Sequence, residues 1–325
     1  MRAVVAQGSG GPEVLRVVDV DAPVPGPADL LVHVRATAVN RADVLQRRGM
    51  YPPPPGTTDV LGLEVAGEVA GVGADAAGWR EGDAVFAILP GGGYAEYAVV
   101  PATVAMPVPG NLDWPGAAAV PEAFLTALDN LRNRGRLADG ETVLLHGGSS
   151  GVGTAAIQLA RAWSCRVLVT ASSRRKLDAC AELGADAGID YGRDDFVERA
   201  VELTGGRGVD VILDIVGGPY LDRNVRALAP DGRLVVIGLM GGASAELDLA
   251  RLLTRRLSVS ASTLRARGVD AKAALADQAR REVSPLLAAG TVRPVVDRVL
   301  GLDDVADAHA LMESSEHIGK IVLTV

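Results

Sequence analysis

The chain has 325 residues and a net charge of −8 at pH 7, so it is long enough for two domains, and its charge argues against a nucleic-acid-binding surface. It contains no apolar run of about 18 residues and no signal-peptide pattern, so we expect a cytoplasmic protein with no membrane-spanning segment. Its two cysteines, Cys165 and Cys180, are too few for a disulfide framework or a four-cysteine zinc site.

Residues 1 to about 112 show the pattern of short strands separated by glycine- and proline-rich turns. This spacing favours a small barrel or sandwich over repeated βαβ units. One helix is expected at Arg41–Arg48, and the four prolines that follow Tyr51 predict a stiff, extended loop. The expected strands are Met1–Gln7, Leu15–Val20, Leu30–Val39, Glu64–Val72, Asp83–Ile88 and Ala95–Val100.

Two helices are predicted next, between this region and the rest of the chain. Asp113 is a suitable N-cap for the first of them. Pro121 interrupts the pattern, and a second helix is expected to end near Gly135.

From Glu141 onward, apolar strands alternate with helical patterns, which predicts a parallel, doubly wound sheet of the α/β class. The expected strands are Thr142–Leu145, Arg166–Thr170, Ala187–Asp190, Val209–Val216, Arg233–Gly238 and Leu257–Ala261. Helices are expected from Val152 and at Arg174–Leu183, Asp194–Leu203, Tyr220–Leu228 and Val269–Ala289.

The C-terminal residues again show the strand-rich pattern of residues 1 to about 112, with a strand at Val295–Leu300, a helix at Asp303–Glu313 and a strand at Ile321–Val325. We therefore expect the first domain to take back the C-terminus. The predicted domains are residues 1–120 with 292–325, and residues 121–291.

The turn that follows Thr142–Leu145 is rich in glycine and serine, with the sequence Gly-Gly-Ser-Ser-Gly-Val-Gly over residues 147–153. Between a parallel strand and a helix, such a turn exposes backbone N–H groups that bind phosphate. Gly148 and Gly153 match the outer positions of the dinucleotide fingerprint G-x-G-x-x-G, although Ser150 replaces its middle glycine. A P-loop is excluded, because Thr154 and Ala155 stand where Lys and Ser/Thr are required.

The same turn also matches G-x-S-x-G, the nucleophile elbow of α/β-hydrolases, and a tight turn without a ligand is a third reading. Ser149, Asp214 and His309 or His317 follow one another in the order of a hydrolase triad. That fold, however, has several strands and crossover helices before its elbow. Here the turn follows the first strand of its own sheet, where a Rossmann fingerprint belongs, so dinucleotide binding is favoured.

The second strand of the sheet ends at Thr170 without the Asp or Glu that would accept the ribose 2′-OH of NAD. Two serines and three cations, Ser172 to Lys176, follow at once. Hydroxyls and cations at this place suit a 2′-phosphate, because charge-assisted bonds to phosphate are strong. The turn therefore predicts NADPH, the alternative being a solvated basic turn.

Taken together, several stretches resemble a known family, the zinc-independent medium-chain dehydrogenase/reductases, in particular their NADPH:quinone oxidoreductase (zeta-crystallin-like) branch. The resemblance covers the whole chain. It implies a GroES-like β-rich catalytic domain, a Rossmann domain, NADPH in the cleft between them, and a homodimer formed through the Rossmann edge strand Leu257–Ala261. The stretches that carry it are 40–43, 51–54, 62–64, 90–93, 150–159 and 317–322.

The zinc-dependent relatives bind catalytic zinc through Cys, His and a third ligand, where this sequence has Asn40, Leu63 and Glu122. One amide and one carboxylate do not make a tetrahedral zinc site, so we expect no metal. Without a Lewis acid, easily reduced acceptors such as quinones become the natural substrates.

The resemblance also implies the site residues. Asn40, Asp43, Tyr51 and Thr126 would line the nicotinamide and substrate cleft. The pyrophosphate would lie at Gly148, Ser150, Gly151, Val152 and Gly153, and the 2′-phosphate at Ser173 and Lys176, to which charge and position add Arg175. The remaining cofactor contacts would be Tyr191, Val216, Gly217, Met240, Leu264 and Lys320.

Three functions are compatible with these residues. The first is NADPH-dependent reduction of a small quinone-like acceptor. The second is reduction of an α,β-unsaturated carbonyl, such as an enone or an enoyl thioester, and the third is a non-catalytic NADPH-binding stress protein.

Overall fold

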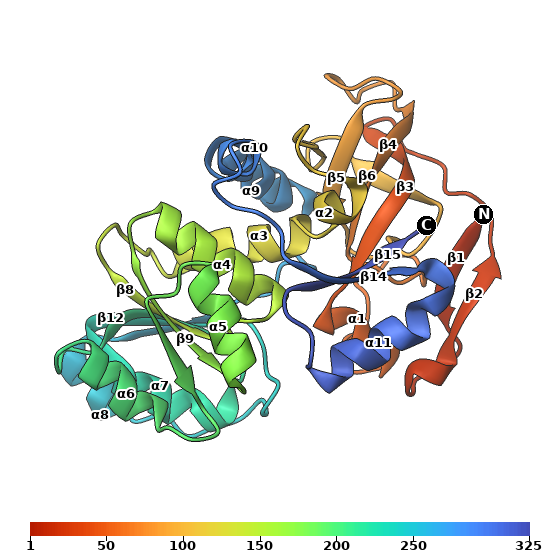
Figure 1. Cartoon of the computed structure of the whole chain (residues 1–325). Coiled ribbons are helices and arrows are strands. Elements are labelled where there is room, and N and C mark those ends of the chain that lie inside the picture. The colour runs from red at the N-terminus through yellow and green to blue at the C-terminus, as the bar shows by residue number, and fades with distance from the viewer. The chain divides into compact units, whose positions relative to one another are not determined.

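The computed structural model describes all 325 residues and divides into two compact units. Unit 1 comprises Met1–Leu125 and Leu264–Val325, and unit 2 comprises Thr126–Thr263 (Figure 1). The division differs from the predicted one, which placed residues 264–291 in the nucleotide-binding domain. The helical segment after Leu264 belongs to unit 1 because it bonds there: Arg280 donates to the carbonyls of Thr103 and Ala105.

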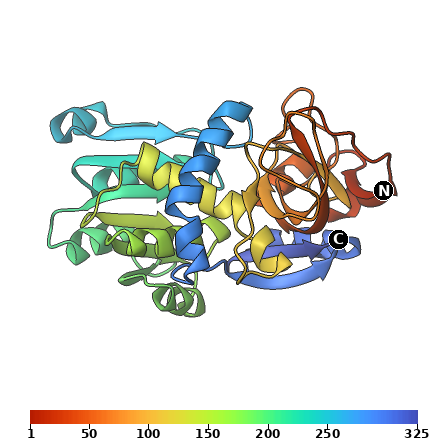
Figure 2. The same cartoon turned by 90° about the horizontal axis from the view of Figure 1, so that it is seen from above.

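Unit 1 is built on a seven-stranded sheet in the order β14-β15-β3-β4-β5-β7, with β6 also paired to β3. β15 pairs antiparallel with β3, which places the last strand of the chain in the sheet of unit 1. Both termini lie in this unit (Figures 1 and 2). Its strands are β1 (Arg2–Ala6), β2 (Leu15–Asp19), β3 (Asp29–Val39), β4 (Glu64–Val72), β5 (Ala84–Ile88), β6 (Tyr97–Pro101), β7 (Met106–Pro107), β14 (Val296–Gly301) and β15 (Lys320–Thr324).

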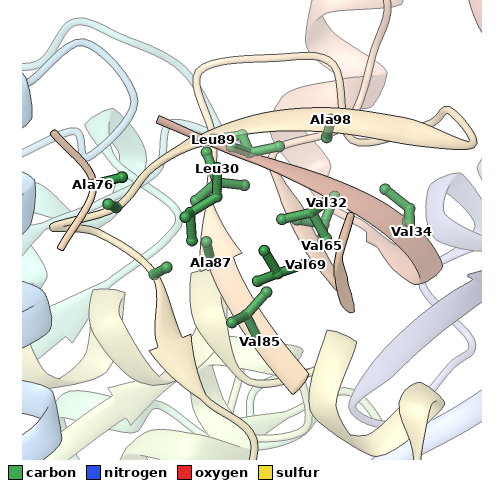
Figure 3. Close-up of a cluster of buried hydrophobic side chains, with 13 residues drawn as sticks. Leu30, Val32, Val34, Val65, Val69, Ala76, Val85, Ala87, Leu89 and Ala98 are labelled. Carbon is green, nitrogen blue, oxygen red and sulfur yellow. The ribbon is translucent and has the colours of Figure 1, made fainter. Parts of the chain in front are cut away.

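Alternation of side chains along these strands builds the core of unit 1. Leu30, Val32 and Val34 of β3 are buried at every second position, as expected for a strand with one face on a core. They pack with alternate residues of β4 and β5, among them Val65 and Val85, in the cluster drawn in Figure 3. This apolar core fixes the positions of the strands. The polar residues of the site lie at the ends of these strands.

The helices of unit 1 are short, except for α9 and α11. The single long helix predicted over Val269–Ala289 is wrong: α9 ends at Glu282, and α10 starts at Ser284. Pro285 stands in the first turn of α10, where its missing N–H costs nothing, whereas inside a continuous helix it would leave a carbonyl unpaired. The helices are α1 (Arg41–Arg47), α2 (Trp114–Ala118), α9 (Val269–Glu282), α10 (Ser284–Ala288) and α11 (Val305–Ser314), and α3 (Pro121–Leu128) spans the boundary between the units.

Unit 2 contains a six-stranded parallel sheet in the order β10-β9-β8-β11-β12-β13 (Figure 2). This is the doubly wound order 3-2-1-4-5-6, so the predicted Rossmann fold is confirmed. The strands are β8 (Thr142–His146), β9 (Arg166–Ala171), β10 (Ala187–Asp190), β11 (Val209–Asp214), β12 (Leu228–Val236) and β13 (Ser258–Ala261). The helices are α4 (Gly151–Ala162), α5 (Arg174–Glu182), α6 (Phe196–Leu203), α7 (Leu221–Ala227) and α8 (Leu249–Arg255), the last of which was not predicted.

The strand order of unit 2 reverses direction between β8 and β11, which are hydrogen-bonded neighbours. In open α/β sheets, ligands bind outside the carboxyl ends of the strands at such a switch point. The glycine-rich turn follows β8 at this edge, and the loop from Ile215 follows β11. No helix in either unit has the length and apolar character needed to cross a membrane.

Candidate active site

The glycine-rich turn brings the start of α4 very close to the end of β8. A Cβ at Gly153 would lie 2.4 Å from the carbonyl oxygen of Gly147 and 2.6 Å from that of Gly148. Only glycine allows this approach, which is the packing role of the last glycine in the dinucleotide fingerprint. Gly147 itself has a φ of +68°, a conformation that side chains disfavour.

The same turn leaves backbone donors for an anion. Ser150 is the N-cap of α4, and its hydroxyl oxygen accepts the amide N–H of Gly153 at 3.0 Å. The amides of Gly151 and Val152 occupy the first helical positions, where no acceptor exists within the helix. No other backbone bond uses them, so these two N–H groups and the helix dipole fit the pyrophosphate of a dinucleotide.

The basic turn after β9 has the geometry of a second phosphate site. Ser173 is the N-cap of α5, and its Oγ accepts the amide N–H of Lys176 at 3.4 Å. Arg174 pairs with Asp178 at 2.8 Å on the exposed side. Lys176 is only 8% exposed, whereas Arg175 is exposed. A largely buried lysine beside a serine cap, with no acidic residue at the strand end, fits a 2′-phosphate better than a ribose hydroxyl.

The other predicted cofactor residues of unit 2 follow the next strands at the same edge. Tyr191 comes directly after β10 and is 48% exposed. Val216 and Gly217 follow β11, and Met240 lies beyond β12 with 55% of its surface exposed. Leu264 and Lys320, predicted as further cofactor contacts, belong to unit 1.

In unit 1 the polar residues gather around the carboxylate of Glu64, which is 0% exposed. Its Oε1 accepts from Lys320 Nζ at 2.7 Å and from Asn40 Nδ2 at 2.8 Å. Its Oε2 accepts the backbone N–H of Glu122 at 2.8 Å. One buried carboxylate therefore links the end of β3, the start of α3 and the start of β15.

Lys320 uses all three of its ammonium protons inside this cluster. Besides Glu64 it donates to Asn40 Oδ1 at 2.6 Å and to the carbonyl of Val39 at 3.3 Å. An ammonium group has three donors and no acceptor. Lys320 therefore fixes the amide of Asn40, and a direct cofactor contact by its ammonium would require the loss of one of these bonds.

Asp43 lies in a second buried group next to Asn40. Its Oδ2 accepts the backbone N–H of Asn40 at 2.7 Å and the hydroxyl of Tyr94 at 3.1 Å. Its Oδ1 is buried without a partner, and burial raises the pKa of this carboxyl to about 6. Asp43, predicted to line the substrate cleft, is 0% exposed, and its carboxylate contacts Asn40 and Tyr94.

The group continues from Tyr94 to two further buried side chains. Tyr94 Oη lies 3.4 Å from His309 Nε2, and Arg47 Nη1 lies 3.4 Å from His309 Nδ1. An arginine only donates, so Nδ1 is the acceptor and Nε2 carries the proton. Burial lowers the pKa of His309 to about 3, so the ring is neutral.

Glu122 is the acid of this region that holds a proton at neutral pH. Burial, reinforced by the charge of Glu64, raises the pKa of its carboxyl to about 8, although Lys320 opposes the shift. Ionised Glu122 is therefore unfavourable in the fold. Since the folded-state pKa lies above the ordinary value of 4.5, stability is highest below that value and is lost as the pH rises through about 8.

We expect the Glu122→Gln variant to melt at the same temperature as the wild type at pH 5 and higher than it at pH 9. On a scale of about 2–4 °C per kcal/mol, the difference at pH 9 should be about 3 °C or more. Thermal unfolding at both pH values measures it. Equal melting temperatures at pH 9 would show that ionisation of Glu122 does not destabilise the fold.

Tyr51 is held by a residue that the sequence did not single out. Arg265 is 4% exposed, and its Nη1 donates to the carbonyl of Tyr51 at 3.2 Å. Its Nε donates to Pro90 at 2.7 Å, its Nη2 donates to Gln46 Oε1 at 2.7 Å, and its guanidinium carbon lies 5.3 Å from the centre of the Tyr51 ring. Arg265 thus fixes the proline loop. Thr126, the fourth predicted substrate residue, lies partly buried on α3.

The hydrolase interpretation needs Asp214 as the acid and His309 or His317 as the base, and Asp214 and His309 are hydrogen-bonded to other groups. The carboxylate of Asp214 accepts the backbone N–H groups of Val216 and Gly217 and the side chain of Asn224. His309 is bonded to Arg47 and Tyr94 in unit 1. The acid of the predicted triad and one of its two candidate bases, His309, therefore have other hydrogen-bond partners.

Comparison with known proteins matches two family models, the alcohol dehydrogenase GroES-like domain over residues 26–110 and the zinc-binding dehydrogenase model over residues 151–279. The quinone oxidoreductase of Lama guanicoe is 34% identical over 328 residues, covering 99% of this chain and 97% of its own. The structure of Escherichia coli quinone oxidoreductase complexed with NADPH is 29% identical, with a TM-score of 0.91 and 100% of both chains covered. That of an NAD-dependent alcohol dehydrogenase is 34% identical, with a TM-score of 0.88 and full coverage of both chains.

Proposed function

Because the chain belongs to the medium-chain dehydrogenase/reductase family, in its quinone oxidoreductase group, we propose that it transfers hydride from NADPH to a quinone without zinc. The observation that carries this proposal is the buried cluster of Glu64, Asn40 and Lys320. By the resemblance, Asn40 stands at one of the positions where zinc-dependent relatives have a metal ligand, and its amide is bonded here to Glu64 and Lys320.

The side chains at this place support a reaction without zinc. Asn40 and Leu63 offer neither a thiolate nor an imidazole, and the carboxylate of Glu64 is already paired with an ammonium. No group of three or more His, Cys, Asp or Glu side chains in the structure is arranged to bind a metal ion.

NADPH is the cofactor, as in the Escherichia coli quinone oxidoreductase of the same fold. When bound, it supplies a hydride. The chain's own residues bind and orient: the amides of Gly151 and Val152 take the pyrophosphate, and Ser173 and Lys176 take the 2′-phosphate. Asn40, held rigid by Lys320, and Tyr51, held by Arg265, orient the acceptor. Positioning of this kind provides most of the acceleration of hydride transfer, because a quinone needs no strong acid catalyst.

A panel of acceptors tests the proposal. With NADPH, 9,10-phenanthrenequinone should be turned over with a kcat/KM at least tenfold above that of an α,β-unsaturated ketone. A preference for the ketone would favour the alternative reductase. NADPH binding without turnover of any acceptor would favour the non-catalytic protein.

Lys176→Ala should lower the ratio of kcat/KM for NADPH to that for NADH by roughly ten- to a hundredfold. A charge-assisted hydrogen bond contributes about 1.5–3 kcal/mol, and NADH lacks the phosphate that accepts it. The ratio is the diagnostic quantity, because a folding defect would depress both values. Arg174→Ala, which removes an exposed cation of the same turn, should leave the ratio within about threefold. An unchanged ratio in Lys176→Ala, or a wild type that prefers NADH, would refute the phosphate assignment.

We also propose a homodimer formed through the edge strand β13. This strand is hydrogen-bonded on one side only, and an unprotected edge invites pairing with a second copy. Beside it, α8 exposes Leu249 (64%) and Leu253 (79%), an apolar surface that pairing would cover.

Light scattering should therefore give twice the chain mass of 33.4 kDa for the wild type. Leu253→Asp should shift the mass toward the monomer. Val24→Asp, which changes an equally exposed apolar residue (89%) of unit 1, should not. A monomeric wild type would refute the dimer.

A further inference from the structure

Four polar side chains are buried together under the cofactor-binding edge of unit 2. They are His146 at the end of β8, Thr170 near the end of β9, Asp214 at the end of β11 and Asn224 in α7. Each is 2% exposed or less. Polar groups in a sheet core are costly unless all of their hydrogen bonds are made, so their arrangement is informative.

The donor and the acceptor of each hydrogen bond among these residues can be assigned in only one way. Asn224 Nδ2 donates to Asp214 Oδ2 at 3.1 Å, so Asn224 Oδ1 is the acceptor that faces His146 Nε2 at 2.7 Å. His146 therefore carries its proton on Nε2, and its Nδ1 accepts from the Thr170 hydroxyl at 3.1 Å. Burial lowers the pKa of His146 to about 4, so the ring is neutral, as this chain of bonds requires.

Both ends of this chain reach a loop at the switch point. At one end, the hydroxyl oxygen of Thr170 accepts the backbone N–H of Gly147 in the glycine-rich turn at 3.3 Å. At the other end, Asp214 accepts the backbone N–H groups of Val216 at 2.7 Å and Gly217 at 3.1 Å. The chain thus connects the turn after β8 with the loop after β11.

Aromatic packing holds the central ring in place. The His146 ring meets Phe196 edge-on, with 4.7 Å between ring centroids, and Tyr220 likewise at 4.9 Å. Its rotation is therefore restricted, and both ring nitrogens stay aligned with their partners.

We propose that His146 and Asn224 are positioning residues for NADPH: their hydrogen-bond chain fixes the loops after β8 and β11 relative to each other, so that the binding edge is preformed before the cofactor arrives. Neither residue touches the cofactor in this account. They reduce the ordering that binding would otherwise require, which is how preorganisation increases affinity. The proposal rests on the assignment of NADPH to this edge.

Two replacements of His146 separate positioning from simple core packing. Glutamine presents an acceptor oxygen and a donor nitrogen in the same pattern as neutral histidine, whereas leucine has neither. In fluorescence titrations, His146→Leu should raise the Kd for NADPH at least tenfold, and His146→Gln should stay within about threefold of the wild type. At saturating NADPH, kcat with a quinone should change less than twofold in both, since no reacting atom is touched.

Hydrogen exchange of the cofactor-free protein supplies a readout that needs no ligand. Peptides covering Gly147–Gly153 and Val216–Gly218 should exchange faster in His146→Leu than in His146→Gln or the wild type. Thr170→Val removes only the hydroxyl of the chain, so it should weaken NADPH in the same sense if His146→Leu proves too unstable to purify.

The proposal is overturned if Gln and Leu at position 146 weaken NADPH equally, or if neither weakens it. Wild-type protein that fails to bind NADPH would refute the cofactor assignment together with the proposal. Normal NADPH binding without quinone turnover would refute only the proposed reaction, and the comparison of the two variants would still decide the positioning role.

Discussion

Gly153→Ala is expected to weaken NADPH binding more than a hundredfold. The new Cβ would lie 2.4 Å from the Gly147 oxygen and 2.6 Å from the Gly148 oxygen, and both oxygens belong to the backbone, so the start of α4 must move away from the turn. That shift disrupts the amide donors for the pyrophosphate. Overpacking of this kind also costs about 1–3 kcal/mol of stability. Titration with NADPH, together with thermal unfolding, measures both effects.

Two control variants make the Gly153 result specific. At Gly110 an added Cβ would meet nothing within 4 Å, so Gly110→Ala should bind NADPH like the wild type. Ser149→Ala alters the residue that a hydrolase would use as nucleophile, and it too should leave binding and turnover nearly unchanged. If Gly153→Ala binds NADPH within threefold of the wild type, the turn does not hold the pyrophosphate.

Lys320→Met should destabilise the protein by about 3–5 kcal/mol at pH 7, because it leaves the buried carboxylate of Glu64 without its cation. The same change releases Asn40 Oδ1, so quinone turnover should fall as well. Lys272→Met is the matched control, since this lysine is also buried but donates to a single carbonyl, that of Arg265. Its cost should be smaller, about 1.5–3 kcal/mol.

The double variant Glu64→Gln with Lys320→Met distinguishes a charge effect from a packing effect. It removes both members of the ion pair, so its loss of stability should be at least about 1 kcal/mol smaller than the sum of the two single losses. Denaturant unfolding of the four proteins gives the cycle. Strict additivity, or a Lys320→Met variant within about 1 kcal/mol of the wild type, would show that the pair is unimportant.

Local patterns were sufficient to predict most of the fold. β10 matches its predicted range, Ala187–Asp190, the N-cap of α2 is Asp113 as predicted, and α5 begins at the predicted Arg174. The glycine-rich turn and the basic turn are also local in sequence. The helix α8 was not predicted because it is short and because Leu249 and Leu253 are exposed, while Leu252 alone packs against a core cluster.

The chemistry of unit 1 could not be predicted in the same way, because it depends on contacts between distant residues. Glu64 and Lys320 are 256 positions apart, and no spacing rule relates them. The resemblance pointed to Asn40 and Lys320 separately, but not to the buried carboxylate of Glu64 that binds both. Arg265 gave no signal at all, since its three acceptors come from three separate segments.

The most direct test of the account is the rate of NADPH oxidation by 9,10-phenanthrenequinone after dialysis of the protein against a strong chelator, with the zinc content measured on the same sample. We expect turnover to be the same before and after chelation, with well under one zinc per chain in both samples. Loss of turnover on chelation and its recovery on addition of zinc would contradict the account.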